Sequence, residues 1–212
     1  MKTTEERKKH WEHVYKTRSP NDVSWYQTHP ESSLKLIEKS LSNKSMSCID
    51  VGGGASVLVD CLIAADFTNI SVLDISEQAL QHTKERLKEK AEQVQWYISD
   101  ILTFKSPHKF DLWHDRAVFH FLTDPDDRKQ YIQILKESLN NQGHLIIATF
   151  GIDGPEKCSD LPIKQHDTTT IMEELGDEFT LLETFDEYHL TPKNIQQKFS
   201  YFHCIFNRGA TS

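Results

Sequence analysis

Short apolar runs alternate with amphipathic stretches along most of this chain. The runs have the character of buried strands, and they lie at residues 46–51, 69–75, 94–100, 110–115 and 144–150. Helices are expected between them, at residues 56–67, 76–93 and 124–139. In the second of these, apolar side chains recur at spacings of three and four, on one helical face. This alternation is typical of a parallel sheet covered by helices, so the sequence predicts an α/β fold.

The last third of the chain departs from this alternation. Residues 151–168 are polar, a short helix is expected at 169–175, and strand-like runs follow at 179–190 and 197–207. Only TPKNIQ joins these two runs. A parallel crossover needs about a dozen residues or more, so the two strands are expected to pair antiparallel. Together with the five earlier strands, they predict a mostly parallel sheet of seven strands with an antiparallel terminal hairpin and helices on both faces.

Charge and composition limit the expected partners. The chain has 212 residues, of which 37% are hydrophobic and 26% charged, and its formal net charge is −8. Such a chain can bury one core, but its acidic balance disfavours nucleic acid, whose phosphates recruit basic surfaces. No apolar run approaches the ~20 residues of a membrane span, and the polar N-terminus does not resemble a targeting peptide. We therefore expect a cytoplasmic protein with no nucleic-acid or membrane partner.

Metal-binding patterns are not evident in the sequence. The four cysteines are scattered, without a CxxC pair, and the eleven histidines form neither an HxxxH nor an HExxH pattern. Structural zinc and metalloprotease sites usually show such spacings. We therefore expect no metal site.

A glycine-rich turn follows the first predicted strand. Gly52, Gly53 and Gly54 stand there, and Asp74 ends the next strand 20 residues after the last glycine. Glycines allow the backbone to approach a ligand closely, and the carboxyl edge of a parallel sheet is where open α/β folds bind ligands. The spacing is that at which an acidic side chain reaches the hydroxyls of a ribose. These features together predict a nucleoside site.

Three further positions bear on which nucleoside is bound. Dinucleotide turns follow the pattern G-x-G-x-x-G/A, but Val57 stands where the last small residue would be. Asp50, just ahead of the glycines, would repel a pyrophosphate and suit a cationic ligand. Asp100 ends the third strand and could read an adenine edge. A nicotinamide-dependent dehydrogenase therefore fits this turn less well than a protein that binds a cationic nucleoside.

The ordered motifs resemble those of the class I S-adenosylmethionine-dependent methyltransferases. The matching segments are IDVGGGAS, SVLDIS, YISDI, FDLWHDRAVFHFL and LNNQGHLIIATF. They occur in the family's order over about residues 46–150, and the terminal hairpin also belongs to the family's pattern. The resemblance implies a Rossmann-like fold and an enzyme that uses S-adenosyl-L-methionine and releases S-adenosyl-L-homocysteine.

The glycine turn has an implied role in this family. The resemblance implies that Gly52, Gly53 and Gly54 line the methionine portion of the cofactor, with Asp50 near its ammonium group. Ser56 stands where the family often has a further glycine. A serine can cap the following helix instead, so binding is expected to survive this difference.

The other strand ends also have implied roles. The resemblance implies that Asp74 holds the ribose hydroxyls and that Ile75 packs on the adenine. It further implies that Asp100 accepts from the adenine amino group while the backbone of Ile101 serves the ring. His114, at the end of the fourth strand, is expected near the cofactor and close to where the methyl group emerges.

The N-terminal segment carries several aromatic residues. Trp11 and Tyr15 are four apart and share one helical face, and SWYQ follows at residues 24–27. The segment could anchor an N-terminal helix through an apolar flap, or it could close over the cofactor, whose sulfonium would be attracted to a ring face. We expect residues 1–30 to form a helical lid in which Trp11 and Tyr15 contact the cofactor, ahead of a single domain at 31–212. Tyr26 is then the residue expected nearest the transferring methyl.

Two residues near the fourth strand are candidate bases. Asp115 and Arg116 either pair as surface ions, or Asp115 orients or deprotonates the acceptor. His120 is a second candidate base, since relatives often carry a histidine there. Methyl transfer mainly requires alignment and exclusion of water, and a base is needed only for a protonated acceptor.

Four functions are compatible with the sequence. A methyltransferase acting on a small-molecule nucleophile is the first expectation, because the loop after the fifth strand is short and no recognition domain is evident. A protein lysine N-methyltransferase is the alternative, because DRAVF and the N-terminal aromatic pair resemble eukaryotic elongation-factor lysine methyltransferases. Those enzymes usually carry Asp-Lys-Gly where Asp115, Arg116 and Ala117 stand here. The other two are a nicotinamide-dependent dehydrogenase and a non-catalytic cofactor-binding interaction protein.

Overall fold

The computed structural model describes residues 3–19 and 22–209. In the first half of the chain, the elements are α1 (Thr4–Thr17), α2 (Glu31–Ser40), β1 (Cys48–Val51), α3 (Leu58–Ala64), β2 (Ile70–Asp74), α4 (Glu77–Leu87), η2 (Lys88–Gln93) and β3 (Val94–Ile98). In the second half, they are η3 (Ile101–Thr103), β4 (Phe110–Arg116), η4 (Phe119–Phe121), α5 (Pro125–Ser138), β5 (Leu139–Phe150), β6 (Lys157–Cys158), β7 (Leu161–Pro162), α6 (Thr168–Leu175), β8 (Phe179–Leu190) and β9 (Gln196–Phe206).

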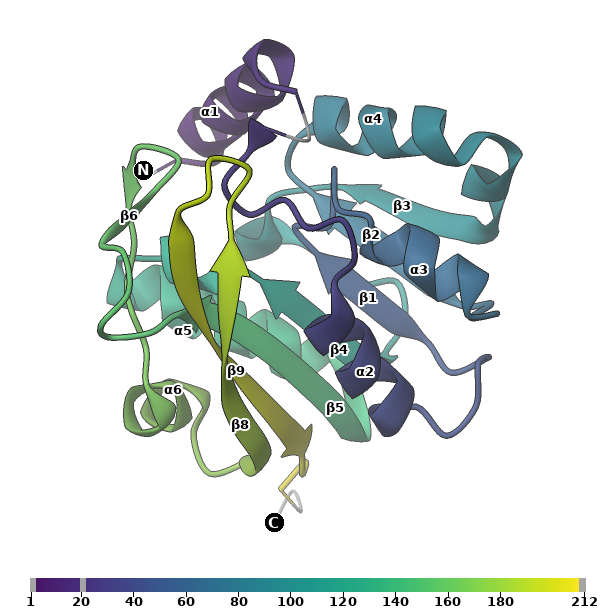
Figure 1. The fold of residues 1–212 in the computed structure, drawn as a ribbon. Coiled ribbons are helices and arrows are strands. Elements are labelled where there is room, and N and C mark those ends of the chain that lie inside the picture. Colours follow the sequence, from purple (N-terminus) through teal and green to yellow (C-terminus); the bar gives the residue numbers. More distant parts are fainter. Residues whose placement is uncertain (1–2, 20–21, 210–212) are drawn as a thin grey trace.

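One seven-stranded sheet organises the molecule (Figure 1). Its strand order is β3-β2-β1-β4-β5-β9-β8. The first five strands in this order pair parallel, whereas β9 is antiparallel to both of its neighbours, β5 and β8. The predicted fold class and the terminal hairpin are therefore confirmed. A separate two-stranded sheet, β6–β7, lies within the segment predicted as a polar loop.

Helix boundaries follow local capping. Ser76 accepts from the Ala79 amide at the start of α4, and Asp124 accepts from the Asp126 amide at the start of α5. The prediction of one helix over residues 76–93 is wrong in its second part. Lys88 has a φ of 54°, which an α-helix does not allow, and the chain continues as the 3₁₀-helix η2.

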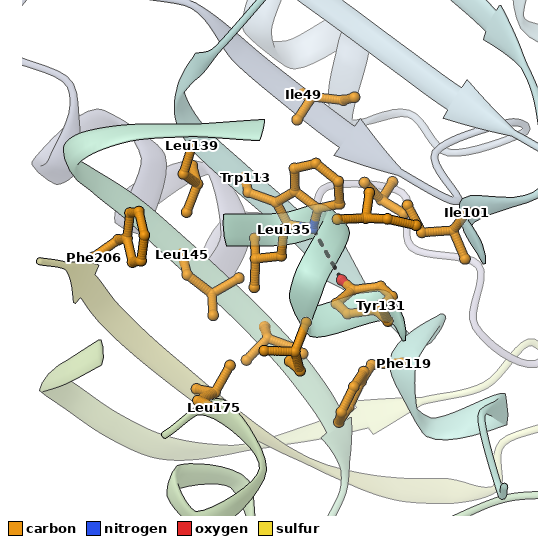
Figure 2. Packing of buried hydrophobic residues seen from close by; sticks show 14 of the residues in the cluster. Ile49, Ile101, Trp113, Phe119, Tyr131, Leu135, Leu139, Leu145, Leu175 and Phe206 are labelled. Carbon is orange, nitrogen blue, oxygen red and sulfur yellow. Dashed lines mark hydrogen bonds between the residues drawn. The ribbon is translucent and has the colours of Figure 1, made fainter. Parts of the chain in front are cut away.

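Two apolar clusters cover opposite faces of the sheet. On one face, α5 and α6 pack on side chains that include Trp113 and Phe202, and Figure 2 shows the Trp113 indole donating to the hydroxyl of Tyr131. On the other face, α2, α3 and α4 pack on side chains that include Leu112 and Tyr201. Neighbouring residues of one strand thus enter different clusters, as the twofold side-chain period of a strand requires.

Helix α1 lies across the edge of the sheet at which the parallel strands end (Figure 1). The Glu12 carboxylate accepts from the Glu77 amide at 2.7 Å, so α1 caps the start of α4. The carbonyl of Tyr15 lies 3.1 Å from Nε2 of His82, also on α4. The predicted lid, residues 1–30, thus contains one helix docked on α4, although residues 1–2 and 20–21 lie outside the described part of the chain, as do residues 210–212 of the predicted domain.

The helices formed by the described residues include none with the length and apolar character needed to span a bilayer.

Candidate functional site

Two adjoining hollows occupy the carboxyl edge of the parallel strands. The first is lined by residues at and after the ends of β2 and β3, among them Asp74, Ile75, Asp100 and Ile101, and by Trp11 of α1. The second is lined by residues around the glycine turn and β4, among them Asp50, Gly53, Tyr26 and His114. Four residues line both, namely Tyr15, Trp25, Gly52 and Arg116. The two hollows therefore form one cleft.

The glycine turn is shaped by close approaches that only glycine permits. Gly52 has a φ of +71°, and a Cβ there would collide with the side chain of Val118. A Cβ on Gly53 would collide with Oδ2 of Asp50, and one on Gly54 would collide with the carboxylate of Asp74. The turn can therefore lie directly on these two carboxylates.

Ser56 follows the turn and stabilises the start of the next helix. Its hydroxyl accepts from the amide of Leu58, the first residue of α3, at 3.1 Å, although Val57 is the capping position. The prediction that Ser56 itself caps the helix is therefore off by one residue, although its hydroxyl still bonds the first amide of α3.

Asp74 is held rigidly at the end of β2. Its Oδ2 accepts from the amide of Gly54 at 3.0 Å and its Oδ1 accepts from the amide of Ser76 at 2.8 Å. Burial raises the pKa of this carboxyl to about 6, although both amides act in the opposite direction. Each oxygen has accepted one bond and keeps capacity for another, so Asp74 can accept from a pair of hydroxyls.

Asp50 presents one unsatisfied oxygen. Its Oδ1 lies 2.7 Å from Nδ1 of His114, whereas its buried Oδ2 has no hydrogen-bond partner among the described residues. Leaving a buried carboxylate oxygen unsatisfied is costly, so this atom favours a cationic donor in the second hollow.

Asp100 is already paired with the N-terminal helix. Its Oδ2 accepts from Nε and Nη2 of Arg7, both at 2.8 Å, and its Oδ1 accepts from the amide of Leu102 at 3.0 Å. Arg7 also lies 3.4 Å from Asp127 at the start of α5. Helix α1 is therefore fastened to the far side of the first hollow as well as to α4.

Aromatic rings from the N-terminal segment and from η4 cover the cleft. Trp11 packs edge-to-face on Trp25 and on Phe121, with ring centroids 5.7 and 5.0 Å apart, and Tyr15 lies 6.5 Å from Trp25. Tyr15 is buried, and its hydroxyl pKa is raised by burial and by the nearby Asp74. The sequence indicated Trp11 and Tyr15, but it missed Trp25, which lies in a loop where no periodicity marks the ring that turns inward.

Tyr26 lies at the outer end of this cleft. It lines the second hollow together with Gln27, and both also line an open groove against Glu187 and His189 of the terminal hairpin. Gln27 donates to Glu187 at 3.0 Å. Tyr26 thus lines the second hollow, and its place nearest the transferring methyl stays a prediction.

The structure places the Asp115 side chain outside the cleft. This position argues against its predicted role as a base. Its side chain faces α5, where Oδ2 accepts from the Tyr131 hydroxyl at 2.6 Å. Its Oδ1 accepts from the amides of Val118 and Phe119, at 2.9 and 3.3 Å. These bonds fix the turn after β4, and Asp115 lines neither hollow.

His120 is also removed from the cleft. Its ring is fully buried between Phe121 and Phe150, at centroid distances of 4.5 and 4.9 Å. Burial lowers its pKa to about 3, so the ring is neutral. It lines neither hollow, and we assign it no part in proton transfer.

The sequence allowed Arg116 to be a surface ion paired with Asp115. In the structure, Arg116 is instead the charged residue that β4 contributes to the cleft. Its side chain is only 9% exposed, lies over the ring of Phe199, and donates to the hydroxyl of Tyr201 and the carbonyl of Trp25. Because side chains alternate along a strand, Arg116 shares its face with His114 and not with Asp115. That parity could have identified it from the sequence.

Comparisons with known proteins agree with this geometry. A family model described as a methyltransferase domain matches residues 42–202. The chain is 26% identical over 116 residues to nodulation protein S of Rhizobium tropici, and 24% identical over 120 residues to nodulation protein S of Sinorhizobium fredii (strain NBRC 101917 / NGR234). These matches cover 55% and 56% of this chain, and 46% and 55% of the relatives, so the chain spans about half the length of the curated relatives it matches.

Solved structures share the fold. The N-methyltransferase NodS from Bradyrhizobium japonicum WM9, in complex with S-adenosyl-L-homocysteine, matches with a TM-score of 0.69 and 18% identity over 92% of this chain and 97% of that one. A SAM-dependent methyltransferase from Anabaena variabilis ATCC 29413 matches with a TM-score of 0.74 and 14% identity, over 98% and 96%. The family model covers more than half of the chain, and it agrees with these folds. The chain belongs to the class I S-adenosylmethionine-dependent methyltransferases.

Proposed function

We propose that this methyltransferase acts on a small-molecule nucleophile. The observation that carries the proposal is the aromatic roof formed by Trp11, Trp25 and Phe121 over the cleft. An acceptor must enter beneath these rings to reach a methyl donor in the cleft, which favours a compact molecule over a folded protein surface. The N-methyltransferase NodS shares the fold, which is compatible with a nitrogen acceptor.

The residues of the cleft fit the cofactor. S-adenosylmethionine supplies an electrophilic methyl group on a sulfonium when it is bound. Its ammonium group would satisfy the unpartnered Oδ2 of Asp50, and the glycine turn leaves room for its methionine chain. The acidic residue and the close backbone at the second hollow therefore suit the cationic end of the cofactor.

The first hollow fits the adenosine portion. Asp74 has free acceptor capacity on both oxygens for the ribose hydroxyls. Ile75 and Ile101 line the same hollow and would pack on the adenine, and Asp100 would accept from its amino group beside Arg7. We propose these contacts together, because a single bound S-adenosylmethionine would make all of them.

Residues 1–30 would act as the lid of this site, and residues 31–212 would form the domain beneath it. Helix α1 is fastened to α4 through Glu12 and to β3's end through Arg7, so it spans the cleft. A closed lid excludes water and holds the donor and acceptor in line, which is the main catalytic requirement of methyl transfer. Tyr26, at the outer mouth, is the residue we propose to contact the acceptor.

The cofactor part of the proposal is tested by thermal shift. S-adenosylhomocysteine should raise the melting temperature, whereas NAD should not. Stabilisation by NAD alone would favour a dehydrogenase.

The acceptor part is tested with labelled cofactor. The protein is incubated with cell extract and methyl-labelled S-adenosylmethionine, and the metabolites are separated from the proteins. Label is expected in the small-molecule fraction. Label confined to protein, in methyl-lysine, would support the protein lysine N-methyltransferase instead, and no transfer despite binding would indicate a non-catalytic interaction protein.

A further inference from the structure

We propose that Ser33 and Tyr201 are positioning residues that hold Asp50 and Arg116 at the two ends of one buried hydrogen-bond relay. The role of this relay in cofactor binding rests on the function proposed above. Neither residue lies in a motif that the sequence singled out. Ser33 comes from α2 and Tyr201 from β9, yet each bonds a side chain at the end of β4, Ser33 that of His114 and Tyr201 that of Arg116.

The relay is continuous from one charge to the other. Oδ1 of Asp50 lies 2.7 Å from Nδ1 of His114, and Nε2 of the same ring lies 2.9 Å from Oγ of Ser33. That hydroxyl lies 3.3 Å from the hydroxyl of Tyr201, which accepts from Nε of Arg116 at 3.1 Å. The three residues between the two charges are each at least 97% buried.

The two ends fix the direction of every bond. A guanidinium only donates, so Tyr201 accepts from Arg116 and its own proton is free for Ser33. Burial raises the pKa of the Tyr201 hydroxyl, which keeps this proton in place. A carboxylate only accepts, so Nδ1 of His114 donates to Asp50. Ser33 then accepts from Tyr201 and donates to Nε2 of a neutral His114 ring.

Other proton arrangements leave buried groups unsatisfied. If Nε2 of His114 carried a proton, Ser33 would accept it. The bond between the hydroxyls of Ser33 and Tyr201 can use only one of their two protons, so the other proton would lack an acceptor among the described residues. A ring protonated only on Nε2 would also face Asp50 with a lone pair at 2.7 Å. The Nδ1–H tautomer of His114 is the one that uses every donor.

The relay fixes two groups of the cleft. At one end, His114 occupies Oδ1 of Asp50 and leaves Oδ2 as the acceptor for the cofactor's ammonium group. At the other end, Arg116 also donates to the carbonyl of Trp25, at 3.1 Å, and therefore holds the aromatic roof. Removal of a middle link should loosen both ends. Of the middle residues, His114 and Ser33 line the second hollow, whereas Tyr201 lines neither hollow and can act only through its neighbours.

The test measures S-adenosylhomocysteine affinity by calorimetry in Ser33→Ala and Tyr201→Phe. Each change removes one hydroxyl and no bulk beyond it. We expect the dissociation constant to rise about tenfold in each, the size of one net hydrogen bond within a charged network.

Matched controls separate positioning from stability. Ser71→Ala removes a buried serine hydroxyl without a partner among the described residues, and Tyr131→Phe removes a buried phenol from the opposite face. Both controls are expected to bind with unchanged affinity, even where urea unfolding shows a loss of stability. Equal weakening in Ser33→Ala and Ser71→Ala, or wild-type affinity in both relay variants, would overturn the proposal.

A second readout needs no cofactor. Nitrogen-15 NMR of the unliganded protein should show His114 as a neutral ring protonated on Nδ1, and Ser33→Ala should change its signals. A ring protonated on Nε2 would refute the relay even if the protein binds the cofactor. The relay tautomer in a protein that binds no S-adenosylhomocysteine would instead refute only the proposed function.

Discussion

Asp74 and Asp115 provide a test in which two similar carboxylates should behave differently. Both are buried at the ends of parallel strands, β2 and β4, that flank β1; both accept from backbone amides, and burial raises the pKa of each to about 6. Only Asp74 lines the cleft. The change of each to asparagine keeps the shape of the side chain and one carbonyl oxygen, while it removes the charge.

The magnitude follows from the bonds that each variant loses. Asp74→Asn retains one acceptor oxygen, so about one charge-assisted bond to the ribose is lost, worth about 1.5–3 kcal/mol. At 1.4 kcal/mol for each factor of ten, the dissociation constant of S-adenosylhomocysteine should rise about 10- to 150-fold. Asp115→Asn should instead lower the free energy of unfolding by about 1–3 kcal/mol, because its amide nitrogen cannot accept from the turn after β4.

Calorimetry and urea unfolding of both variants give the two quantities separately. Affinity loss confined to Asp74→Asn is the expected result. Unchanged affinity in Asp74→Asn would refute the assignment of the ribose. An equal loss of affinity in Asp115→Asn, with its stability intact, would show that the strand end faces the ligand after all and would return Asp115 to the site.

Three other outcomes are expected. S-adenosylhomocysteine affinity should fall about tenfold per pH unit as the pH drops below about 6, because burial raises the pKa of Asp74 and a protonated carboxyl cannot accept both hydroxyls. Calorimetry measures this affinity, and Asp74→Asn should give a flat profile in that range. Gly52→Ala should cost at least about 1–3 kcal/mol in urea unfolding, from its positive φ and the collision with Val118, and a variant of wild-type stability would contradict that geometry. Arg7→Ala should accelerate cofactor release in stopped-flow measurements by freeing α1, whereas the exposed Lys8→Ala should not; equal rates would argue against a fastened lid.

The sheet was predictable because its central parallel strands, such as β1 and β2, are buried on both faces and leave short continuous apolar runs. The hairpin was predictable because a six-residue link cannot make a parallel crossover. The end of α4 was not predictable, since the polar face continues past Leu87 while the backbone at Lys88 turns to a positive φ. Helix periodicity contains no signal for that change.

The cleft was predictable where the chain is regular. The glycine turn and Asp74 are linked by one strand–helix–strand unit, whose length brings them to the same edge, and the structure joins them by a hydrogen bond. On β4, the choice of Asp115 over Arg116 is off by one residue, which in a strand means the opposite face. In the N-terminal loop, Trp25 and Tyr26 are adjacent without any period, so the sequence could not predict that Trp25 lines both hollows whereas Tyr26 lines only the second of them.

The place of β9 in the sheet has a consequence for how the molecule is made. Strand β8 is translated before β9, yet among the described strands it pairs only with β9. Strand β8 therefore has no described strand to pair with until β9 has been synthesised, whereas β1 to β5 all precede both in the sequence. Tyr201 arrives on that late strand. The hydrogen bonds that join Ser33 to Arg116 through Tyr201 are therefore completed only after β9 has been synthesised, later than the glycine turn and Asp74.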